Sequence, residues 1–149
     1  MTTQPSKISN DALQLYQEVL LKHHKTPTGF EVEINNTHSA DGVNAACGDE
    51  IVVYAQVEAG TITALGFSGD SCAICRASAS IMCSYLTNVE VDQVEAIIEH
   101  TISIINSTHT DELICAEVLQ PLLAVGKFPV RRQCAILPWR TFVKAVLES

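Results

Sequence analysis

The stretch Gly69-Asp70-Ser71-Cys72-Ala73-Ile74-Cys75-Arg76-Ala77-Ser78 separates two halves of the chain that carry different sequence patterns. Before it, short runs rich in β-branched residues predict strands, and after it, apolar residues at helical spacing predict helices. Two more cysteines, Cys47 and Cys134, lie far from it on either side. We expect Cys47, Asp49, Cys72 and Cys134 to converge on one metal and sulfur site at this junction.

Three segments before the junction predict a small sheet. Residues 37–44 carry a weak strand pattern, whereas residues 50–58 carry a strong one because β-branched and aromatic side chains dominate them. The chain then turns at Ala59-Gly60 and returns through residues 61–67. A turn this short permits only antiparallel pairing of the two flanking strands.

Helices are predicted on both sides of this sheet. The first begins at Ser9 or Asn10 and ends at Thr26, because the residue before a proline avoids helical angles. Two more are expected after the junction, at residues 72–86 and at residues 91–105, where apolar residues recur every three or four positions.

The last third of the chain contains two prolines that limit its helices. Residues 111–123 predict a helix whose end Pro121 disturbs, followed by a break at residues 126–129. In the final segment, residues 130–147, we expect Pro138 to begin a new helical turn, because a proline in a helix interior costs about 3 kcal/mol.

These elements predict an α+β fold, in which a three-stranded antiparallel sheet packs against about five helices. A chain of 149 residues is long enough for one core, so we expect a single domain over residues 1–149, with residues 1–8 as a flexible tail.

The composition excludes several classes of protein. With 47% hydrophobic and 17% charged residues, the chain is typical of a globular protein and not of a disordered one. Its net charge of -8 and scattered basic residues argue against nucleic acid as a partner. It carries neither a signal peptide pattern nor an apolar run that spans a membrane. We therefore expect a cytoplasmic protein whose six cysteines are reduced thiols or metal ligands.

The cysteines outside the helix interiors have local contexts that suit metal binding. Cys47-Gly48-Asp49 lies at the start of the strongest strand, where the glycine lets two side chains point at one atom. Cys72 and Cys134 each lie near a predicted helix start, where the helix dipole lowers the pKa of a thiol. Three such thiols and one carboxylate would complete a tetrahedral zinc site. The spacing alone does not decide between this and cysteines that simply pack in the core.

Other residues admit simpler interpretations. Cys83 and Cys115 lie mid-helix among apolar neighbours and are expected to be packing residues. The five histidines are interpreted as surface or capping residues. The pair Arg131-Arg132 either steadies a thiolate, docks an acidic partner or forms a solvated basic turn.

Four groups of residues match known motifs in the same order along the chain. They are Leu15-Tyr16-Gln17-Glu18 with His23-His24-Lys25-Thr26-Pro27, Asn44-Ala45-Ala46-Cys47-Gly48-Asp49, Phe67-Ser68-Gly69-Asp70-Ser71-Cys72, and Lys127-Phe128-Pro129-Val130-Arg131 with Cys134-Ala135-Ile136-Leu137-Pro138-Trp139. Together they resemble the iron–sulfur assembly scaffold family that includes SufU, IscU and the N-terminal domain of NifU. The SufU branch is the most similar, because the segment between the second and third cysteines is long and Gln133 replaces the histidine that IscU carries.

The resemblance implies a function and a ligand set. The metal would be bound by Cys47, Asp49, Cys72 and Cys134, with Cys134 and Cys47 handling sulfur. The implied protein is a non-enzymatic scaffold that binds Zn²⁺ and accepts persulfide sulfur from a SufS-like cysteine desulfurase. The family's other mode is transient assembly of a [2Fe–2S] cluster on the same three cysteines, for delivery to downstream iron–sulfur acceptor proteins.

Two alternatives belong to other classes of protein. A structural zinc domain would use the same ligands only to fold, and metal removal would then unfold the chain. The sequence Cys72-Ala73-Ile74-Cys75 also resembles a thioredoxin-type redox motif, but that fold needs a βαβ order that this chain does not predict. On the main interpretation Cys75 is a spare thiol beside the site.

Overall fold

The computed structural model describes residues 10–107 and 116–148. Its elements, in chain order, are α1 (Asn10–Lys25), β1 (His38–Asn44), β2 (Asp49–Glu58), β3 (Thr61–Ser68), α2 (Ala73–Leu86), α3 (Val91–Ile105), the 3₁₀ helices η1 (Glu117–Lys127) and η2 (Pro129–Arg131), and α4 (Arg132–Val146). The predicted tail at residues 1–8, the cap at Ser9, the histidine at 109 and the cysteine at 115 lie outside the described residues. The single domain over residues 1–149 stays a prediction.

The sheet has the predicted strands and pairing. Its order is β1-β2-β3, both pairs are antiparallel, and each strand boundary lies within one residue of the prediction. Alternate residues of β2, namely Ile51, Val53 and Ala55, are buried, so one face of the sheet lies against the helices. The register pairs Asn44 with Asp49, which brings the end of β1 beside the start of β2.

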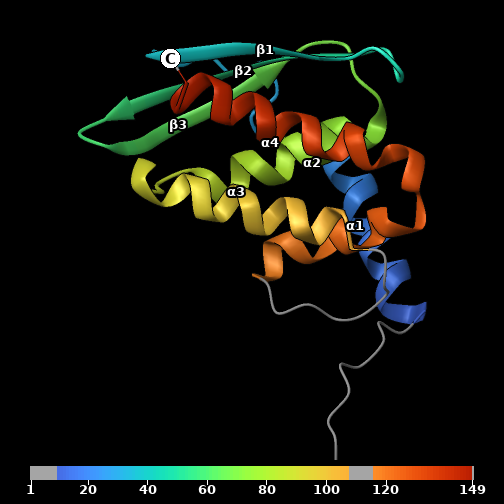
Figure 1. The fold of residues 1–149 in the computed structure, drawn as a ribbon. Helices are drawn as coiled ribbons and strands as arrows, with labels where there is room; N and C mark the ends of the chain where they lie inside the picture. The colour runs from blue at the N-terminus through green and yellow to red at the C-terminus, as the bar shows by residue number, and fades with distance from the viewer. Residues whose placement is uncertain (1–9, 108–115, 149) are drawn as a thin grey trace, which may run out of the picture.

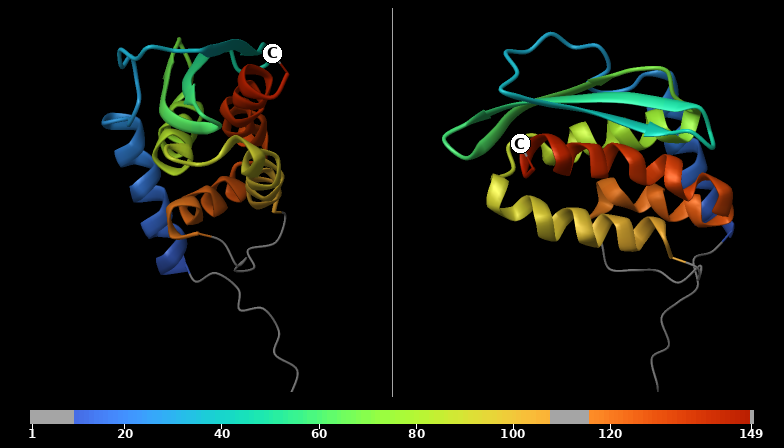
Figure 2. Two further views of the ribbon diagram at one scale, coloured as in Figure 1. Left: turned by 90° about the vertical axis from the view of Figure 1, so that its left-hand side faces the viewer. Right: turned by 45° about the horizontal axis from the view of Figure 1, so that its top comes forward.

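The helices lie in layers under one face of the sheet (Figure 1, Figure 2). Helix α4 packs against β1 and β2, and α2 lies beside α4 and reaches β3. Helix α3 and η1 form the next layer, and α1 crosses α2 and η1 at the flank. The largest fully buried side chains include Trp139 and Phe142 of α4 and Phe67 of β3. This arrangement confirms the predicted α+β fold.

Helices α2 and α3 confirm the predictions most closely. Helix α3 spans the predicted residues, and α2 begins one residue later than predicted because Cys72 is its N-cap. Cys72 has extended backbone angles, and its Sγ accepts a hydrogen bond from the backbone N–H of Cys75 at 3.5 Å. A residue in this position satisfies one of the free N–H groups of the first helical turn.

The two proline-containing segments differ from the prediction. Residues 117–127 form a 3₁₀ helix that runs through Pro121 and Gly126, so the predicted disturbance at Pro121 is wrong, and the predicted break at residues 126–129 is confined to Phe128, between η1 and η2. The expectation that Pro138 begins a new turn is also wrong, because α4 runs through it without interruption. Pro138 cannot donate the usual bond to the Cys134 carbonyl, but the neighbouring Trp139 and Phe142 are fully buried. We infer that core packing outweighs the lost hydrogen bond.

Candidate metal centre

The first corner of the site is the loop between β1 and β2. Residues 45–48 form a turn in which the Cys47 N–H donates to the Asn44 carbonyl at 3.2 Å. Gly48 has φ +70°, a left-handed conformation that favours glycine, and open space surrounds its Cα. The glycine is therefore needed for the backbone angle and not for room, and it allows Cys47 and Asp49 to face the same point.

The second corner is the start of α2, which backbone contacts hold against the first. The Glu50 N–H donates to the Asp70 carbonyl at 2.9 Å. Gly69, at φ +125°, lies so close to the Glu50 backbone that a Cβ atom would overlap it. The Cys72 N–H then donates to Asp49 Oδ1 at 2.7 Å, so the carboxylate orients the helix start directly.

The third corner is the first turn of α4, which contains Cys134. Ser78 of α2 fixes this turn, because its Oγ donates to the Ala135 carbonyl at 2.6 Å and accepts from Trp139 Nε1 at 2.8 Å. All of these groups are buried. The small residues of α2 thus set the distance between the helix starts that carry Cys72 and Cys134.

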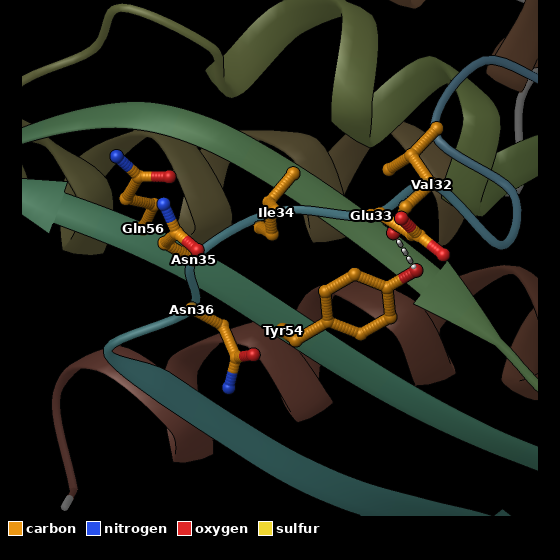
Figure 3. Close-up of a pocket in the computed structure, with 7 residues that line it drawn as sticks. All are labelled: Val32, Glu33, Ile34, Asn35, Asn36, Tyr54 and Gln56. Carbon is orange, nitrogen blue, oxygen red and sulfur yellow. Dashed lines mark hydrogen bonds between the residues drawn. The ribbon is translucent and has the colours of Figure 1, made fainter.

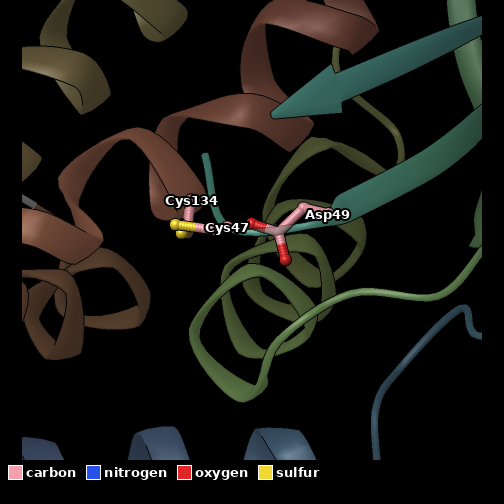
Figure 4. Close-up of side chains that lie close together, drawn as sticks. All are labelled: Cys47, Asp49 and Cys134. Carbon is pink, nitrogen blue, oxygen red and sulfur yellow. The ribbon is translucent and has the colours of Figure 1, made fainter. Parts of the chain in front are cut away.

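The three corners bring the predicted ligands together. One ligand atom from each of Cys47, Asp49 and Cys134 lies within 4.8 Å of the others, and Figure 4 shows the two sulfurs and the carboxylate directed toward one another. Cys72 lies next to this group, because its Sγ is 3.8 Å from Asp49 Oδ2. Three of the predicted residues, separated by up to 87 positions, therefore meet at one point, and Cys72 adjoins them through Asp49.

The four side chains differ in their exposure. Asp49 and Cys134 are fully buried, whereas Cys47 and Cys72 are half-buried. A reagent from solution therefore meets Cys47 and Cys72 first. Of the two cysteines predicted to handle sulfur, Cys134 is the less accessible.

The electrostatics of Cys134 differ from the prediction. Burial, followed by hydrogen bonds with Cys47 and Asp49, raises the pKa of the Cys134 thiol well above its usual range. The expected lowering by the helix dipole is outweighed, because acceptors crowd the sulfur and water is excluded. A metal ion bound among these groups would instead favour the Cys134 thiolate, since a coordinated thiol is deprotonated.

Two neighbours of Cys134 carry hydrogen-bond donors, and of these only Asn44 was not identified from the sequence. Asn44 Nδ2 donates to Cys134 Sγ at 3.6 Å. The exposed Arg131 guanidinium is hydrogen-bonded to Cys134, and this bond together with the charges of Cys72 and Cys134 raises the pKa of Arg131. Arg132 instead donates from Nη2 to the Gly126 carbonyl at 3.4 Å. Of the alternatives for the arginine pair, Arg131 fits the one that steadies a thiolate.

Cys83, Cys75 and His23 lie outside the group of candidate ligands. Cys83 is 2% exposed within α2, which confirms the predicted packing role. Cys75 is 0% exposed and lies behind Cys72. The interpretation of His23 as a surface or capping residue is wrong, because its Nδ1 is hydrogen-bonded to Ser80 Oγ of α2 at 2.7 Å. That contact was not predictable, since 57 residues separate the two.

The donor set fits a soft divalent metal. Thiolates and a carboxylate are ordinary zinc ligands, and four of them complete a tetrahedron. Asp49 is a fully buried acid whose second oxygen faces thiols and not a basic side chain in the contacts of the described residues. A buried carboxylate needs compensation, and a metal ion among these ligands would supply it.

A separate cavity lies away from the centre and is lined by none of these groups. It measures about 780 Å³ and lies between the segment of residues 32–36 and the strand residues Tyr54 and Gln56, as Figure 3 shows. The Tyr54 hydroxyl donates to the Val32 carbonyl at 2.8 Å across one side of it.

None of the described helices has the length and apolar character that crossing a bilayer requires.

Comparison with known proteins identifies the family. The chain is 28% identical over 135 residues to the zinc-dependent sulfurtransferase SufU of Bacillus subtilis, covering 91% of each chain. It is 29% identical over 133 residues to the iron–sulfur cluster assembly scaffold protein IscU of Thermotoga maritima, covering 89% of this chain and 92% of that one.

Solved structures agree on the fold. A structure described as a putative iron–sulfur cluster assembly scaffold protein for the SUF system, from Fervidobacterium islandicum, superposes with a TM-score of 0.74 at 23% identity, covering 89% of this chain and 97% of that one. The family model of the NifU-like N-terminal domain matches residues 15–146. The chain therefore belongs to the NifU-like N-terminal domain family, which confirms the resemblance to SufU and IscU.

Proposed function

We propose that this protein is an iron–sulfur cluster assembly protein that receives sulfur at the Cys47, Asp49, Cys72 and Cys134 centre. One observation carries the proposal: ligand atoms of Cys47, Asp49 and Cys134 converge within 4.8 Å, and Cys72 adjoins them through Asp49. The similarity to a protein named as a zinc-dependent sulfurtransferase and to two named as assembly scaffolds supports the same function.

All four side chains would bind one Zn²⁺, and bound zinc would keep the thiols deprotonated at neutral pH. The protein residues have separate tasks around it. Asp49 orients the start of α2 through its bond to the Cys72 N–H. Asn44 and Arg131 place donors next to Cys134 and so stabilise negative charge on its sulfur.

The sulfur donor would be a cysteine desulfurase, which carries a persulfide. Transfer requires a site thiol that the incoming sulfur can reach, and the half-buried Cys47 and Cys72 meet that need directly. Cys134, fully buried, would take sulfur only after a neighbour or after a local movement. In this role the protein is a transfer partner of the desulfurase, in the cytoplasm, and not an independent enzyme.

A [2Fe–2S] cluster is the cargo in the second form of this function. The same three cysteines would hold the cluster during assembly, and Asp49 would supply an oxygen ligand. Oxygen binds iron more weakly than thiolate does, which favours release to an acceptor protein.

Persulfide labelling tests the proposal. The protein is incubated with a cysteine desulfurase and L-cysteine, the remaining thiols are alkylated, and peptides containing Cys47, Cys72 and Cys134 are examined by mass spectrometry. We expect added sulfur on Cys47 or Cys72 in the wild type and in Cys134→Ser, which should stay folded, whereas onward transfer to residue 134 should be lost in that variant. Cys83→Ser is the matched control outside the centre. If the site cysteines never take sulfur while zinc binds and its removal unfolds the chain, the protein is a structural zinc domain instead.

A further inference from the structure

Cys75 is a buried thiol that the proposed function leaves without a role. It is 0% exposed, and its Sγ is absent from the group formed by Cys47, Asp49 and Cys134. Cys75 nevertheless lies next to residues of the metal centre. The Cys75 backbone N–H donates to Cys72 Sγ at 3.5 Å, and Cys72 in turn contacts Asp49.

The backbone places Cys75 next to Cys72 in a geometry that suits a disulfide. Cys72 is the N-cap of α2 and Cys75 lies three residues later, with 3.5 Å between the Cys75 N and the Cys72 Sγ. Helical geometry separates the Cα atoms of such a pair by about 5 Å. Disulfides form across Cα separations of roughly 4.4–6.8 Å, so this separation lies within the range in which a disulfide forms.

We propose that Cys75 is a resolving thiol, which releases sulfide from a persulfide carried by Cys72. The inference rests on the proposed function in one respect, namely that sulfane sulfur reaches Cys72. The Cys75 sulfur attacks the inner sulfur of the Cys72 persulfide, the Cys72–Cys75 disulfide forms, and the outer sulfur leaves as hydrogen sulfide with the Cys75 proton. The sulfane sulfur gains two electrons, and the two cysteine sulfurs lose two.

Cys72 and Cys75 differ in exposure, and this difference assigns a separate step of the reaction to each. Cys72 is half-buried, so a donor can load it from solution, whereas Cys75 is shielded and meets only what Cys72 carries. Shielding also has a cost, since burial raises the pKa of Cys75 to about 12 and makes its thiolate scarce. Fixed proximity offsets that scarcity, because well-oriented intramolecular reactions reach effective concentrations of about 10⁵ M or more.

The hydrogen sulfide released by this reaction is at the oxidation level of the sulfur in an iron–sulfur cluster. Iron–sulfur clusters contain sulfide, whereas a persulfide delivers sulfur two electrons more oxidised. The reaction at Cys72 and Cys75 supplies those electrons from the protein itself. Each turnover leaves a disulfide in place of the Cys72 thiolate, and an external dithiol must reduce it before Cys72 can act again.

A thiol-free loading experiment tests the inference. The full-length protein is reduced, freed of small thiols under nitrogen, treated with inorganic polysulfide and desalted. Free sulfide released during a chase is then measured with a colorimetric assay, and the cysteine peptides are mapped without reduction. The test variant is Cys75→Ala, which adds no hydroxyl to a buried position. Cys75→Ser is its second form, and Cys83→Ala is the control for another buried thiol of α2.

We expect the wild type and Cys83→Ala to lose about 2 Da as a Cys72–Cys75 disulfide. Cys75→Ala should retain about 32 Da of added sulfur on Cys72 and release about tenfold less sulfide. Three results would overturn the inference: a stable Cys72 persulfide in the wild type, equal sulfide release by Cys75→Ala, or a disulfide joining Cys72 to Cys47 or Cys134. Sulfur found on Cys47 or Cys134 but never on Cys72 overturns it while leaving the proposed function intact. Sulfur on none of the three cysteines overturns both.

Discussion

Ser78 and Asp49 are both fully buried polar side chains, yet their surroundings are organised in opposite ways. Ser78 lies in the seam between α2 and α4, where it donates to the Ala135 carbonyl and accepts from Trp139 Nε1. Asp49 lies at the metal centre, where one oxygen accepts from the Cys72 N–H and the other faces a thiol at 3.8 Å. The seam joins its polar groups by short hydrogen bonds between neutral partners, whereas the Asp49 carboxylate is held by one backbone donor and one long thiol contact and has no basic side chain among these contacts.

This difference separates stability from function in two neighbouring regions of the fold, the α2–α4 seam and the start of β2. A closed hydrogen-bond network rigidifies the core, and removing a member leaves a buried group without a partner. A buried carboxylate among thiols destabilises the metal-free fold, and a metal would reverse that effect. Substitutions in the seam should therefore change folding, and substitutions at the centre should change metal binding.

The largest effect is expected from Trp139→Ala in the seam. The side chain is fully buried and hydrogen-bonded, so its removal should lower the free energy of unfolding by about 3–5 kcal/mol. Urea unfolding of the metal-free protein measures the loss. A loss below 1 kcal/mol, on the order of a surface substitution, would show that the seam is not the main source of stability.

Asp49→Asn should give the opposite pattern at the centre. The amide oxygen can still accept from the Cys72 N–H, but the negative charge is gone. Zinc affinity should fall by about 100-fold, or roughly 2.7 kcal/mol, while the metal-free protein becomes no less stable. Competition with a chromophoric chelator measures the affinity, and urea unfolding measures the stability. A variant that binds zinc normally but unfolds easily would reverse the assignment of the two regions.

Ser78→Ala tests the seam with a smaller change. It leaves Trp139 Nε1 without its buried acceptor, which should cost about 1–3 kcal/mol of stability. Zinc affinity per folded molecule should stay within about twofold of the wild type, because Ser78 does not contact the ligands. A large loss of zinc affinity would mean that the seam positions Cys134 more directly than its hydrogen bonds indicate.

The smallest effect concerns His23, which joins α1 to α2 through Ser80. Burial, and to a lesser extent Lys22, lowers the pKa of His23 from 6.5. The unfolded chain therefore binds more protons than the folded one as the pH falls through about 6.5, and the free energy of unfolding falls with it. His23→Gln should flatten this pH dependence in metal-free protein between pH 7.5 and 5.5, measured by urea unfolding at each pH. Parallel pH profiles for the two proteins would exclude His23 as the cause.

The sequence predicted the sheet well, because its strands depend on local signals, whereas the assignment of Cys47, Asp49, Cys72 and Cys134 as metal ligands stays a prediction. Runs rich in β-branched and aromatic residues predicted β2 and β3, and Gly48 indicated a turn that lets Cys47 and Asp49 point at one atom. The family resemblance added the long-range convergence of Cys72 and Cys134, which spacing alone left open.

What the sequence did not predict depends on tertiary packing. Pro138 continues α4 because the buried Trp139 and Phe142 hold the helix in place, and no local signal carries that information. The raised pKa of Cys134 arises from burial and from acceptors contributed by the β1–β2 loop. The sequence analysis assigned Asn44 no role, because its contact with Cys134 spans 90 residues.

X-ray absorption at the zinc edge tests the central claim most directly. The wild-type protein, loaded with one equivalent of zinc, should show three sulfur ligands near 2.3 Å and one oxygen ligand at about 2.0–2.2 Å. Asp49→Asn should change the oxygen shell and leave the three sulfurs. A spectrum with four sulfurs, or with nitrogen and oxygen ligands alone, would contradict the assignment of Cys47, Asp49, Cys72 and Cys134 as the metal centre.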